Sequence, residues 1–187
     1  MQKYIRYTIF KTRWGYFGLA GSEFGLLRTC LPLSKTEKVK FELIKNRPVA
    51  NRDSSIEHRG STIEFDKKLF SMLQEQIIAY FEGAAINFDS SIPVILDGFS
   101  LFTQRILTTC RNIKYGGIIS YSGLAKRAGR PKAARAVGSA LAKNPLPLII
   151  PCHRVVRNDG KIGGFSALGG ATLKKSLLEL ERQSSKR

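Results

Sequence analysis

Cysteine and histidine are scarce in this chain of 187 residues, which has three cysteines and two histidines. Three cysteines cannot build a full disulfide framework, so we expect a protein of a reducing compartment. A structural metal site needs about four ligands at suitable spacing. Because the Cys and His residues here are scattered along the chain, we predict no bound metal and no other cofactor.

Long hydrophobic runs are also missing. No run of about 18 apolar residues occurs, so no transmembrane helix is predicted, and the N-terminus has no apolar signal core. We therefore expect a cytoplasmic protein, or a nuclear one if the source is eukaryotic, with no membrane partner.

Acidic side chains are few, since Asp plus Glu number 14 against 31 for Lys plus Arg, a formal net charge of +17. This excess favours a polyanion such as nucleic acid, because each neutralised phosphate releases counterions. The alternative is a basic surface that only keeps the protein soluble. Membrane-surface binding is less favoured, because no long basic amphipathic helix is present.

The N-terminal half has the pattern of a small α/β unit. Residues 1–45 alternate apolar and polar side chains between glycines, which predicts two or three antiparallel strands with tight turns. Residues 46–62 are rich in turn formers and predict a loop. Apolar residues recurring every four positions predict an amphipathic helix over 66–81. Residues 84–98 are interpreted as a connector.

The C-terminal half is richer in helix patterns. Helices are predicted over about 100–112 and 171–182, and an extended segment over 145–150. The fold class is therefore α/β (α+β): a small antiparallel sheet with a helix over 1–90, then a helical domain over 98–187.

A helix-turn-helix is predicted within the second half. Ser120 can cap a helix over about 121–128 by accepting a free backbone N–H. Gly129-Arg130-Pro131 breaks that helix, and proline suits the first turn of the next one, over about 131–142. Two short helices across a three-residue turn are typical of this motif.

One cysteine differs from the other two in its surroundings. Cys152 follows an apolar run that ends at Pro151, and His153 and Arg154 follow it directly. A nearby cation lowers the pKa of a thiol, and the thiolate is the nucleophile. A buried structural thiol is the common alternative, and Cys110, on an apolar helical stripe, fits it. The local sequence favours a functional Cys152.

The neighbouring imidazole of His153 is a candidate base for the thiol proton. Adjacent side chains in a strand point to opposite faces, so contact between the two would need a turn or a bridging water. A base also needs a group that orients it. Glu179 and Glu181 on the last predicted helix are the candidates, and spacing alone does not choose between them.

The second predicted helix of the helix-turn-helix is unusually rich in alanine and glycine. Ordinary helix propensity and close packing would explain this composition. The functional interpretation is that small side chains let the helix lie close to DNA and leave Arg135 as its one long probe, able to enter the base stack where a target nucleotide leaves it. The basic residues that would contact phosphates are Lys126, Arg127, Arg130, Lys132 and Lys143.

These residues together resemble the O6-alkylguanine-DNA alkyltransferase family, also called methylated-DNA–protein-cysteine methyltransferases. The resemblance is carried by Asn144-Pro145, by Pro151-Cys152-His153-Arg154-Val155, and by Lys132-Ala133-Ala134-Arg135-Ala136-Val137-Gly138. It extends from about Phe102 to Glu181. It implies a ribonuclease-H-like N-terminal domain over 1–90 and a C-terminal DNA-binding and alkyl-acceptor domain over 98–187.

The resemblance implies roles for the residues of the reaction. Cys152 would accept the alkyl group, and His153 would take the thiol proton through a water, oriented by Glu181. Asn144 would be a hinge that bonds to backbone near Cys152, and Tyr121 would hydrogen-bond guanine N3. Further substrate contacts are expected from the carbonyls of Cys152 and Val155, and from Phe165, Ser166 and Pro147.

The resemblance also implies how the DNA is bound and repaired. The partner would be duplex DNA that carries O6-alkylguanine, and O4-alkylthymine is an expected second substrate. The helix-turn-helix would enter the minor groove, and the target base would be flipped out. Each molecule, acting as a monomer, would react once. The residues expected at the DNA are Arg135, Ser122, Arg130, Lys132, Ala133, Ala134 and Gly138.

Two departures from the family pattern concern the pocket. Phe165 stands where many relatives have tyrosine, and the extra Ala167-Leu168 lengthens the loop over the pocket.

Two other function classes compete with the transferase. A binder that only flags DNA lesions would lack the cysteine, and a cysteine hydrolase would explain neither the basic helices nor Arg135.

Overall fold

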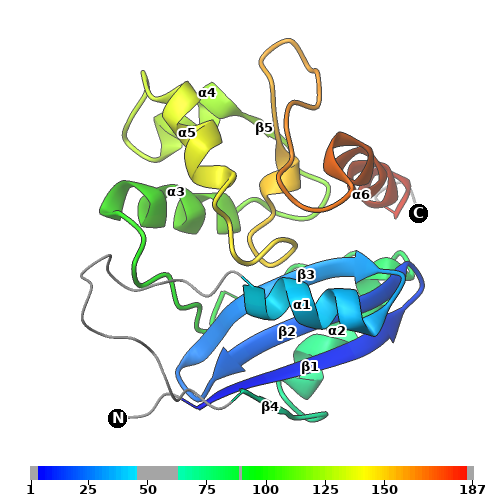
Figure 1. Cartoon of the computed structure of the whole chain (residues 1–187). Coiled ribbons are helices and arrows are strands. Elements are labelled where there is room, and N and C mark those ends of the chain that lie inside the picture. Colours follow the sequence, from blue (N-terminus) through cyan, green and yellow to red (C-terminus); the bar gives the residue numbers. More distant parts are fainter. Residues whose placement is uncertain (1–3, 46–62, 89, 185–187) are drawn as a thin grey trace.

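The computed structural model describes residues 4–45, 63–88 and 90–184, so the predicted loop over 46–62 lies outside the described residues. It confirms the mixed α/β architecture, with a sheet in the N-terminal half and mostly helices in the C-terminal half (Figure 1). Within the described ranges, no helix has the length and apolar character that a membrane crossing requires.

The sheet is built from three consecutive antiparallel strands, as predicted. These are β1 (Ile5–Thr12), β2 (Gly15–Ser22) and β3 (Gly25–Leu33), joined by tight turns at glycines of positive φ. A short β4 (Ile63–Phe65), which the sequence did not predict, pairs with β1 in parallel. The strand order β3-β2-β1-β4 leaves β3 at an edge, and this edge faces the C-terminal half.

One helix covers each face of this sheet (Figure 1). The helix α1 (Thr36–Lys45) corrects the expectation that the strand pattern continues to residue 45. Val39 and Leu43, four residues apart, are buried against β2. Gly18 permits this approach, because a Cβ there would lie 2.5 Å from Cγ1 of Val39.

The opposite face is covered by α2 (Ser71–Phe81), which begins five residues later than predicted. Asp66 causes the late start: its Oδ1 accepts a hydrogen bond from the backbone N–H of Lys68, and the chain reaches Phe70 in the left-handed conformation. Leu69 is buried although it precedes the helix. The apolar residues that recur every four positions are therefore buried as predicted, but the helix they predicted begins later than expected.

The C-terminal half begins with α3 (Leu101–Arg111), close to its predicted range, and ends with α6 (Gly170–Ser184). Two short parallel strands, β5 (Ile119–Ser120) and β6 (Val155–Val156), connect its parts. Helices α4 (Tyr121–Arg127) and α5 (Ala134–Leu141) form the helix-turn-helix.

Its first helix is capped as predicted, since Ser120 Oγ accepts from the backbone N–H of Gly123 at 3.0 Å. The second helix starts three residues later than predicted. Pro131 lies in the turn instead of the first helical turn, and the backbone N–H of Ala133 donates to the carbonyl of Arg130 at 2.9 Å. The inter-helix connection is therefore longer than the predicted three residues.

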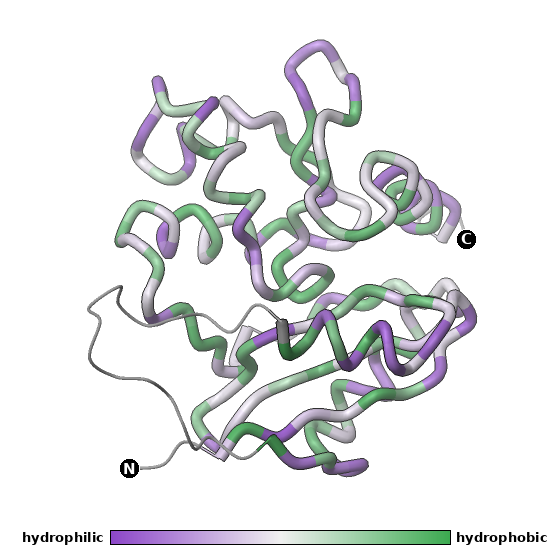
Figure 2. The backbone as a smooth tube through the Cα atoms, viewed as in Figure 1, coloured by the Kyte–Doolittle hydropathy of each residue, from purple (hydrophilic) through white to green (hydrophobic). Residues whose placement is uncertain are grey.

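The segment over 145–150 was predicted to be extended, and this is wrong. It is a series of turns in which the backbone N–H of Ile150 donates to Leu146 O at 2.8 Å and Leu148 has a φ of 80°. Its leucines and isoleucines are buried and belong to one hydrophobic cluster that spans both halves of the molecule. In Figure 2 this central loop is largely hydrophobic, whereas the outer tips of the chain are hydrophilic.

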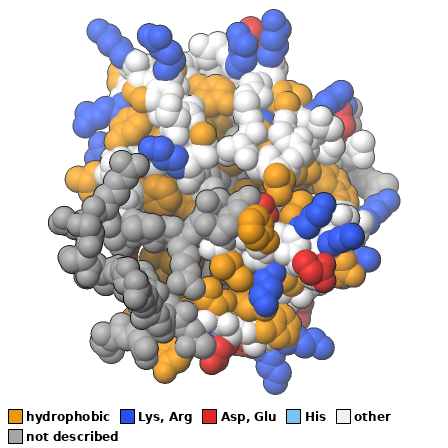
Figure 3. All heavy atoms as spheres, viewed as in Figure 1, with side chains coloured by type: hydrophobic (Ala, Val, Ile, Leu, Met, Phe, Trp, Pro, Cys, Tyr) orange, Lys and Arg blue, Asp and Glu red, His pale blue; other side chains and the backbone are white. Residues whose placement is uncertain are grey.

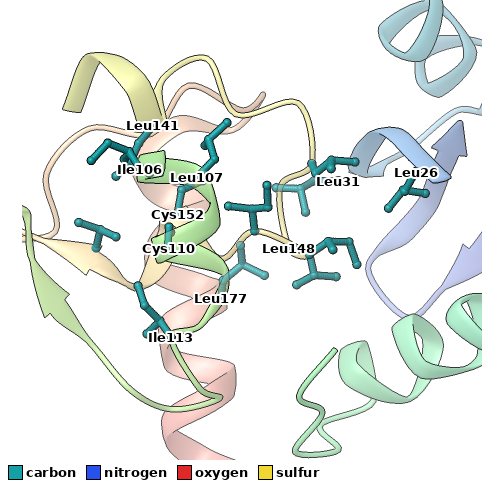
Figure 4. Packing of buried hydrophobic residues seen from close by; sticks show 14 of the residues in the cluster. Leu26, Leu31, Ile106, Leu107, Cys110, Ile113, Leu141, Leu148, Cys152 and Leu177 are labelled. Atoms are coloured by element: carbon teal, nitrogen blue, oxygen red, sulfur yellow. The ribbon is translucent and has the colours of Figure 1, made fainter. Parts of the chain in front are cut away.

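In Figure 4, Leu148 of this loop and Leu31 of β3 lie on the side of Cys152 that faces the N-terminal half, and all three belong to one hydrophobic cluster. The edge of β3 is also bonded to the C-terminal half, because the backbone N–H of Thr29 donates to Pro145 O at 3.0 Å. The two halves thus share a core and a hydrogen-bonded edge. The domain boundaries over 1–90 and 98–187 stay a prediction.

Candidate active site

Cys152 is the first residue of a 3-10 turn, η1 (Cys152–Arg154), and the residue is 7% exposed. Asn144, three residues beyond the last residue of α5, holds the thiol in place. Its Nδ2 donates to Cys152 Sγ at 3.1 Å and to the carbonyl oxygen of Ile150 at 2.9 Å. One amide therefore links the end of the predicted DNA-binding helix to the sulfur and to the backbone beside it.

Burial raises the pKa of the Cys152 thiol above its ordinary value, against the hydrogen bond from Asn144 and the charge of Lys174, which both lower it. The expectation that a neighbouring cation lowers this pKa is therefore wrong in its net direction. Arg154, the expected cation, turns to Glu181 instead. A thiol that is protonated at rest needs a base when it reacts.

The geometry supplies such a base and selects its carboxylate. The ring of His153 is fully buried, and its Nε2 lies 2.8 Å from Glu181 Oε1. Glu179 is exposed, and its Oε1 lies 3.8 Å from Nζ of Lys175. The choice that spacing left open thus falls on Glu181.

Burial lowers the pKa of His153, although the hydrogen bond to Glu181 works in the opposite direction. The imidazole is therefore neutral at neutral pH. Its bond to a carboxylate assigns the proton to Nε2, which leaves the lone pair on Nδ1. Nδ1 is buried and has no hydrogen-bond partner in the described part of the chain. It is therefore available to accept a proton.

Glu181 is held as a carboxylate by several donors. Burial would raise its pKa, but hydrogen bonds from His153 and Arg154 outweigh burial and bring the pKa to about 2. Arg154 donates through Nε and Nη2, at 3.0 and 2.8 Å. Tyr80 of α2 donates its hydroxyl at 2.7 Å, and the backbone N–H of Gly116 donates at 3.1 Å.

Lys174 is a site residue that the sequence analysis missed. It is fully buried, and its Nζ donates to the carbonyls of Val155 at 2.6 Å and Gly164 at 3.2 Å. Burial lowers its pKa, against the raising effects of Cys152 and Cys110. Its spacing from Leu177 and Glu181 was the available signal, since these are the three buried residues of α6.

A pocket of about 300 Å³ borders Cys152 and reaches the N-terminal sheet. The predicted substrate and hinge residues that line it are Asn144, Pro147, Phe165 and Ser166. The predicted phosphate contact Lys143 and the loop residues Ala167 and Leu168 line it too. The sequence did not predict that β3 and α1 would contribute its opposite wall. Those wall residues are Arg28, Thr29, Cys30, Leu31, Leu33 and Glu42.

Tyr121 and Val155, also predicted as substrate contacts, do not line this pocket but lie beside Lys174. Nζ of Lys174 is 5.7 Å from the centroid of the Tyr121 ring and bonds to Val155 O. Burial raises the pKa of Tyr121, and the charge of Cys152 adds to this effect. The phenol is therefore protonated and able to donate a hydrogen bond.

The predicted DNA contacts share one edge of the molecule, where Lys and Arg side chains project from α4, α5 and the loop at 157–161 (Figure 3). Arg135 is exposed on α5, and Gly138 is half-buried against Tyr121. Ser122 donates its hydroxyl to Asn158 Oδ1 at 2.7 Å. The other exposed cations of this edge are Lys126, Arg127, Arg130, Lys132, Arg157 and Lys161.

Among residues 4–45, 63–88 and 90–184, no group of three or more His, Cys, Asp or Glu side chains is placed so that it could hold a metal ion.

Comparison with known proteins places this geometry among alkyltransferases. The family model described as "6-O-methylguanine DNA methyltransferase, DNA binding domain" matches residues 101–183. The methylated-DNA–protein-cysteine methyltransferase of Rattus norvegicus is 52% identical over 81 residues, which are 43% of this chain and 38% of that protein. The Mycobacterium tuberculosis protein of the same name is 42% identical over 117 residues, 63% of this chain and 68% of that protein.

The segment that matches the rat protein is thus well under half of that protein. A longer segment matches the methylated-DNA–protein-cysteine methyltransferase of Methanothermobacter thermautotrophicus and covers 59% of it. Solved structures match over more of the chain. M. tuberculosis OGT in complex with DNA has a TM-score of 0.72 at 32% identity, covering 96% of this chain and 94% of that one. The O6-methylguanine-DNA methyltransferase of Pyrococcus kodakaraensis has a TM-score of 0.67 at 25% identity, covering 94% and 98%.

Proposed function

The chain belongs to the methylated-DNA–protein-cysteine methyltransferase family, and from this premise we propose that it repairs duplex DNA by moving an alkyl group from O6 of guanine to Sγ of Cys152. The observation that carries the proposal is the arrangement around that sulfur. A pocket borders the thiol, a neutral buried imidazole follows it in the same turn, and an amide from the end of α5 donates to it.

The reaction is a single displacement at carbon. Nδ1 of His153 accepts the thiol proton through a water molecule, and the thiolate attacks the alkyl carbon. A C–S bond forms as the C–O6 bond breaks, and guanine leaves with the electron pair of that bond. Glu181 stabilises the imidazolium that results, as a carboxylate does in other nucleophile–base–acid arrangements.

Guanine leaves well only if donors meet its developing negative charge. Tyr121 donates to guanine N3, and Ser166 donates to O6. The backbone carbonyls of Cys152 and Val155 accept from the guanine amino group, and Val155 O can do so while it accepts from Lys174, because a carbonyl has two lone pairs. Phe165 and Pro147 enclose the base.

The exposed edge with α5 binds the minor groove of DNA. Ala133, Ala134 and Gly138 allow a close approach, while Ser122, Arg130 and Lys132 contact the backbone. Arg135 occupies the space in the stack when the target nucleotide is flipped out, which costs a few kcal/mol. O4-alkylthymine is a second substrate, because it presents the same alkyl–oxygen bond on a flipped base.

The thioether that forms is not reversed, so each molecule acts once and as a monomer. The residues over 98–187 form the DNA-binding and alkyl-acceptor domain, and those over 1–90 form the domain that supports it.

Intact mass measurement tests the proposal directly. After incubation with a duplex that contains O6-methylguanine, the wild-type protein gains the mass of one methyl group and no more. The Cys152→Ala variant, which binds the same duplex, gains none. Unchanged mass in the wild-type protein, with tight binding to the lesion, would instead identify a protein that only recognises damage.

A further inference from the structure

Tyr80 connects the N-terminal half to the buried relay. It lies on α2, is fully buried, and donates its hydroxyl to Glu181 Oε1 at 2.7 Å. The same oxygen lies 2.8 Å from Nε2 of His153. Tyr80, which is 101 positions from Glu181 in the sequence, therefore shares an acceptor atom with the candidate base His153.

Charged and titratable groups surround this acceptor on every side. Arg154 binds both carboxylate oxygens, and Lys174 contributes a further positive charge from α6. Cys152 precedes His153 in η1. The pKa of Cys110 in α3 is raised by Cys152 and lowered by Arg154, so this thiol also lies within the reach of both groups. Tyr115 packs edge-on against Tyr80, with ring centroids 5.8 Å apart.

The orientation of the carboxylate does not depend on Tyr80. Arg154 holds both oxygens, and the backbone N–H of Gly116 donates to Oε2 at 3.1 Å. The tyrosine adds a donor to Oε1 alone. A donor at this atom withdraws negative charge from it, which weakens its attraction for a proton-bearing imidazole.

We propose that Tyr80 is a positioning residue of the relay: by donating to Glu181 Oε1, it limits how strongly the carboxylate stabilises a protonated His153, and so keeps the imidazole neutral and able to accept the thiol proton. The consequence for alkyl transfer rests on the proposed function. The effect on His153 does not, since it can be measured without DNA.

Burial is the largest cause that lowers the pKa of His153, and Glu181 is the group that raises it. Without the Tyr80 hydroxyl, Glu181 should raise the pKa of His153 more strongly. The pKa of His153 should then move upward, toward the pH at which the base would be charged and inactive.

The experiment is an NMR titration of the imidazoles in the full chain, which contains only His58 and His153. A His58→Gln variant assigns the two signals. Tyr80→Phe should raise the titration midpoint of His153 by about half a unit to one unit, the range expected when one donor to a charged carboxylate is lost. The matched control is Tyr115→Phe, which removes the buried hydroxyl of the ring packed on Tyr80; that hydroxyl makes no hydrogen bond to Glu181 in the described part of the chain, so the midpoint should stay unchanged.

A double variant tests whether the effect passes through the carboxylate. In a Glu181→Gln background, Tyr80→Phe should add no shift, because no carboxylate charge remains to be modulated. An equal shift in that background overturns the proposal. Identical behaviour of wild type and Tyr80→Phe also overturns it, whether as equal midpoints or as no titration in either protein.

If Tyr80→Phe does not fold, site-specific replacement of Tyr80 by 3-fluorotyrosine gives the opposite test. The more acidic phenol is a stronger donor and should lower the midpoint, and a raised or unchanged midpoint counts against the proposal. In each variant, the pH at which the methyl-transfer rate falls to half on the acid side should equal the NMR titration midpoint of His153. A wild type that transfers no methyl group refutes the proposed function, while the titration still decides the role of Tyr80.

Discussion

The hydroxyl of Thr29 donates to the carbonyl oxygen of Pro147 at 2.7 Å, and this hydrogen bond joins the edge of the N-terminal sheet to the loop that leads into Cys152. The two residues are 118 positions apart in the sequence. Both line the pocket beside the thiol. The sheet thus forms a wall of the candidate site and also fixes the loop opposite.

Thr29→Val should slow methyl transfer without unfolding the protein, because the backbone N–H of Thr29 keeps its bond to Pro145. Loss of one side-chain hydrogen bond should cost about 1 kcal/mol of unfolding free energy. Single-turnover rates and urea denaturation measure the two effects. Thr12→Val is the control: it removes a hydroxyl bond to the carbonyl of Gly15 at the turn between β1 and β2 and leaves the bond to Pro147 intact, so a rate loss as large as that of Thr29→Val would contradict the assignment.

Lys174→Met should raise the pKa of Cys152 further, because Lys174 is the cation that lowers it. A rise of about one unit would reduce the thiolate fraction at pH 7 about tenfold. The pH dependence of iodoacetamide alkylation, mapped to Cys152 by peptide mass, measures this change. Lys175→Met removes a neighbouring charge that is 63% exposed, and a shift of equal size there would show that any cation on α6 suffices.

Acid should destabilise the protein through Glu181. The pKa of this carboxyl is about 2 in the folded protein against an ordinary 4.5, so between these values the unfolded chain binds more protons. The contribution of Glu181 to the unfolding free energy should therefore be fully present above about pH 4.5, and it should be lost as the pH falls toward 2.

Urea denaturation at a series of pH values measures this dependence. Glu181→Gln should have a smaller slope between pH 4.5 and 2, while Glu179→Gln, at an exposed position, should keep the wild-type slope. Equal slopes in all three proteins would mean that the carboxylate is not the group that titrates.

Gly138→Ala should separate stability from DNA binding. A Cβ at this helical position would lie 3.8 Å from Cε1 of Tyr121, an ordinary contact. The change should therefore raise unfolding free energy by about 0.5–1 kcal/mol. If α5 lies against DNA, the added methyl should weaken duplex binding, by about tenfold for a cost of about 1.4 kcal/mol. Thermal denaturation and duplex titration give the two values, and unchanged affinity would place Gly138 away from the DNA.

Arg135→Ala should reduce repair of a methylated duplex at least about tenfold, because extruding a base costs a few kcal/mol that the arginine helps to offset. The reaction with free O6-benzylguanine needs no extrusion and should change little. Lys132→Ala, which removes another exposed cation of the same edge, is the control. Equal losses with duplex and free base for Arg135→Ala would remove the flipping role.

Much of the fold could be predicted locally. The glycine-bounded strands and the Ser120 cap are set by conformational freedom and hydrogen bonds within a few residues, and both are confirmed. The start of α2 and the 145–150 segment were predicted incorrectly. There, an Asx turn at Asp66 and burial against the other half of the chain overrode the local pattern.

The sequence by itself determined which chemistry is available: a single thiol followed by an imidazole, a basic helix-turn-helix, and a pattern specific enough to indicate the family. Spacing did not choose the carboxylate that meets His153, although the resemblance implied Glu181, which the tertiary structure places there. Only the tertiary structure decided that Lys174 and Tyr80 belong to the site and that the sheet lines its pocket. The reason is physical. These contacts join residues far apart in the chain, and burial, which spacing does not reveal, sets the direction in which the pKa of each group moves.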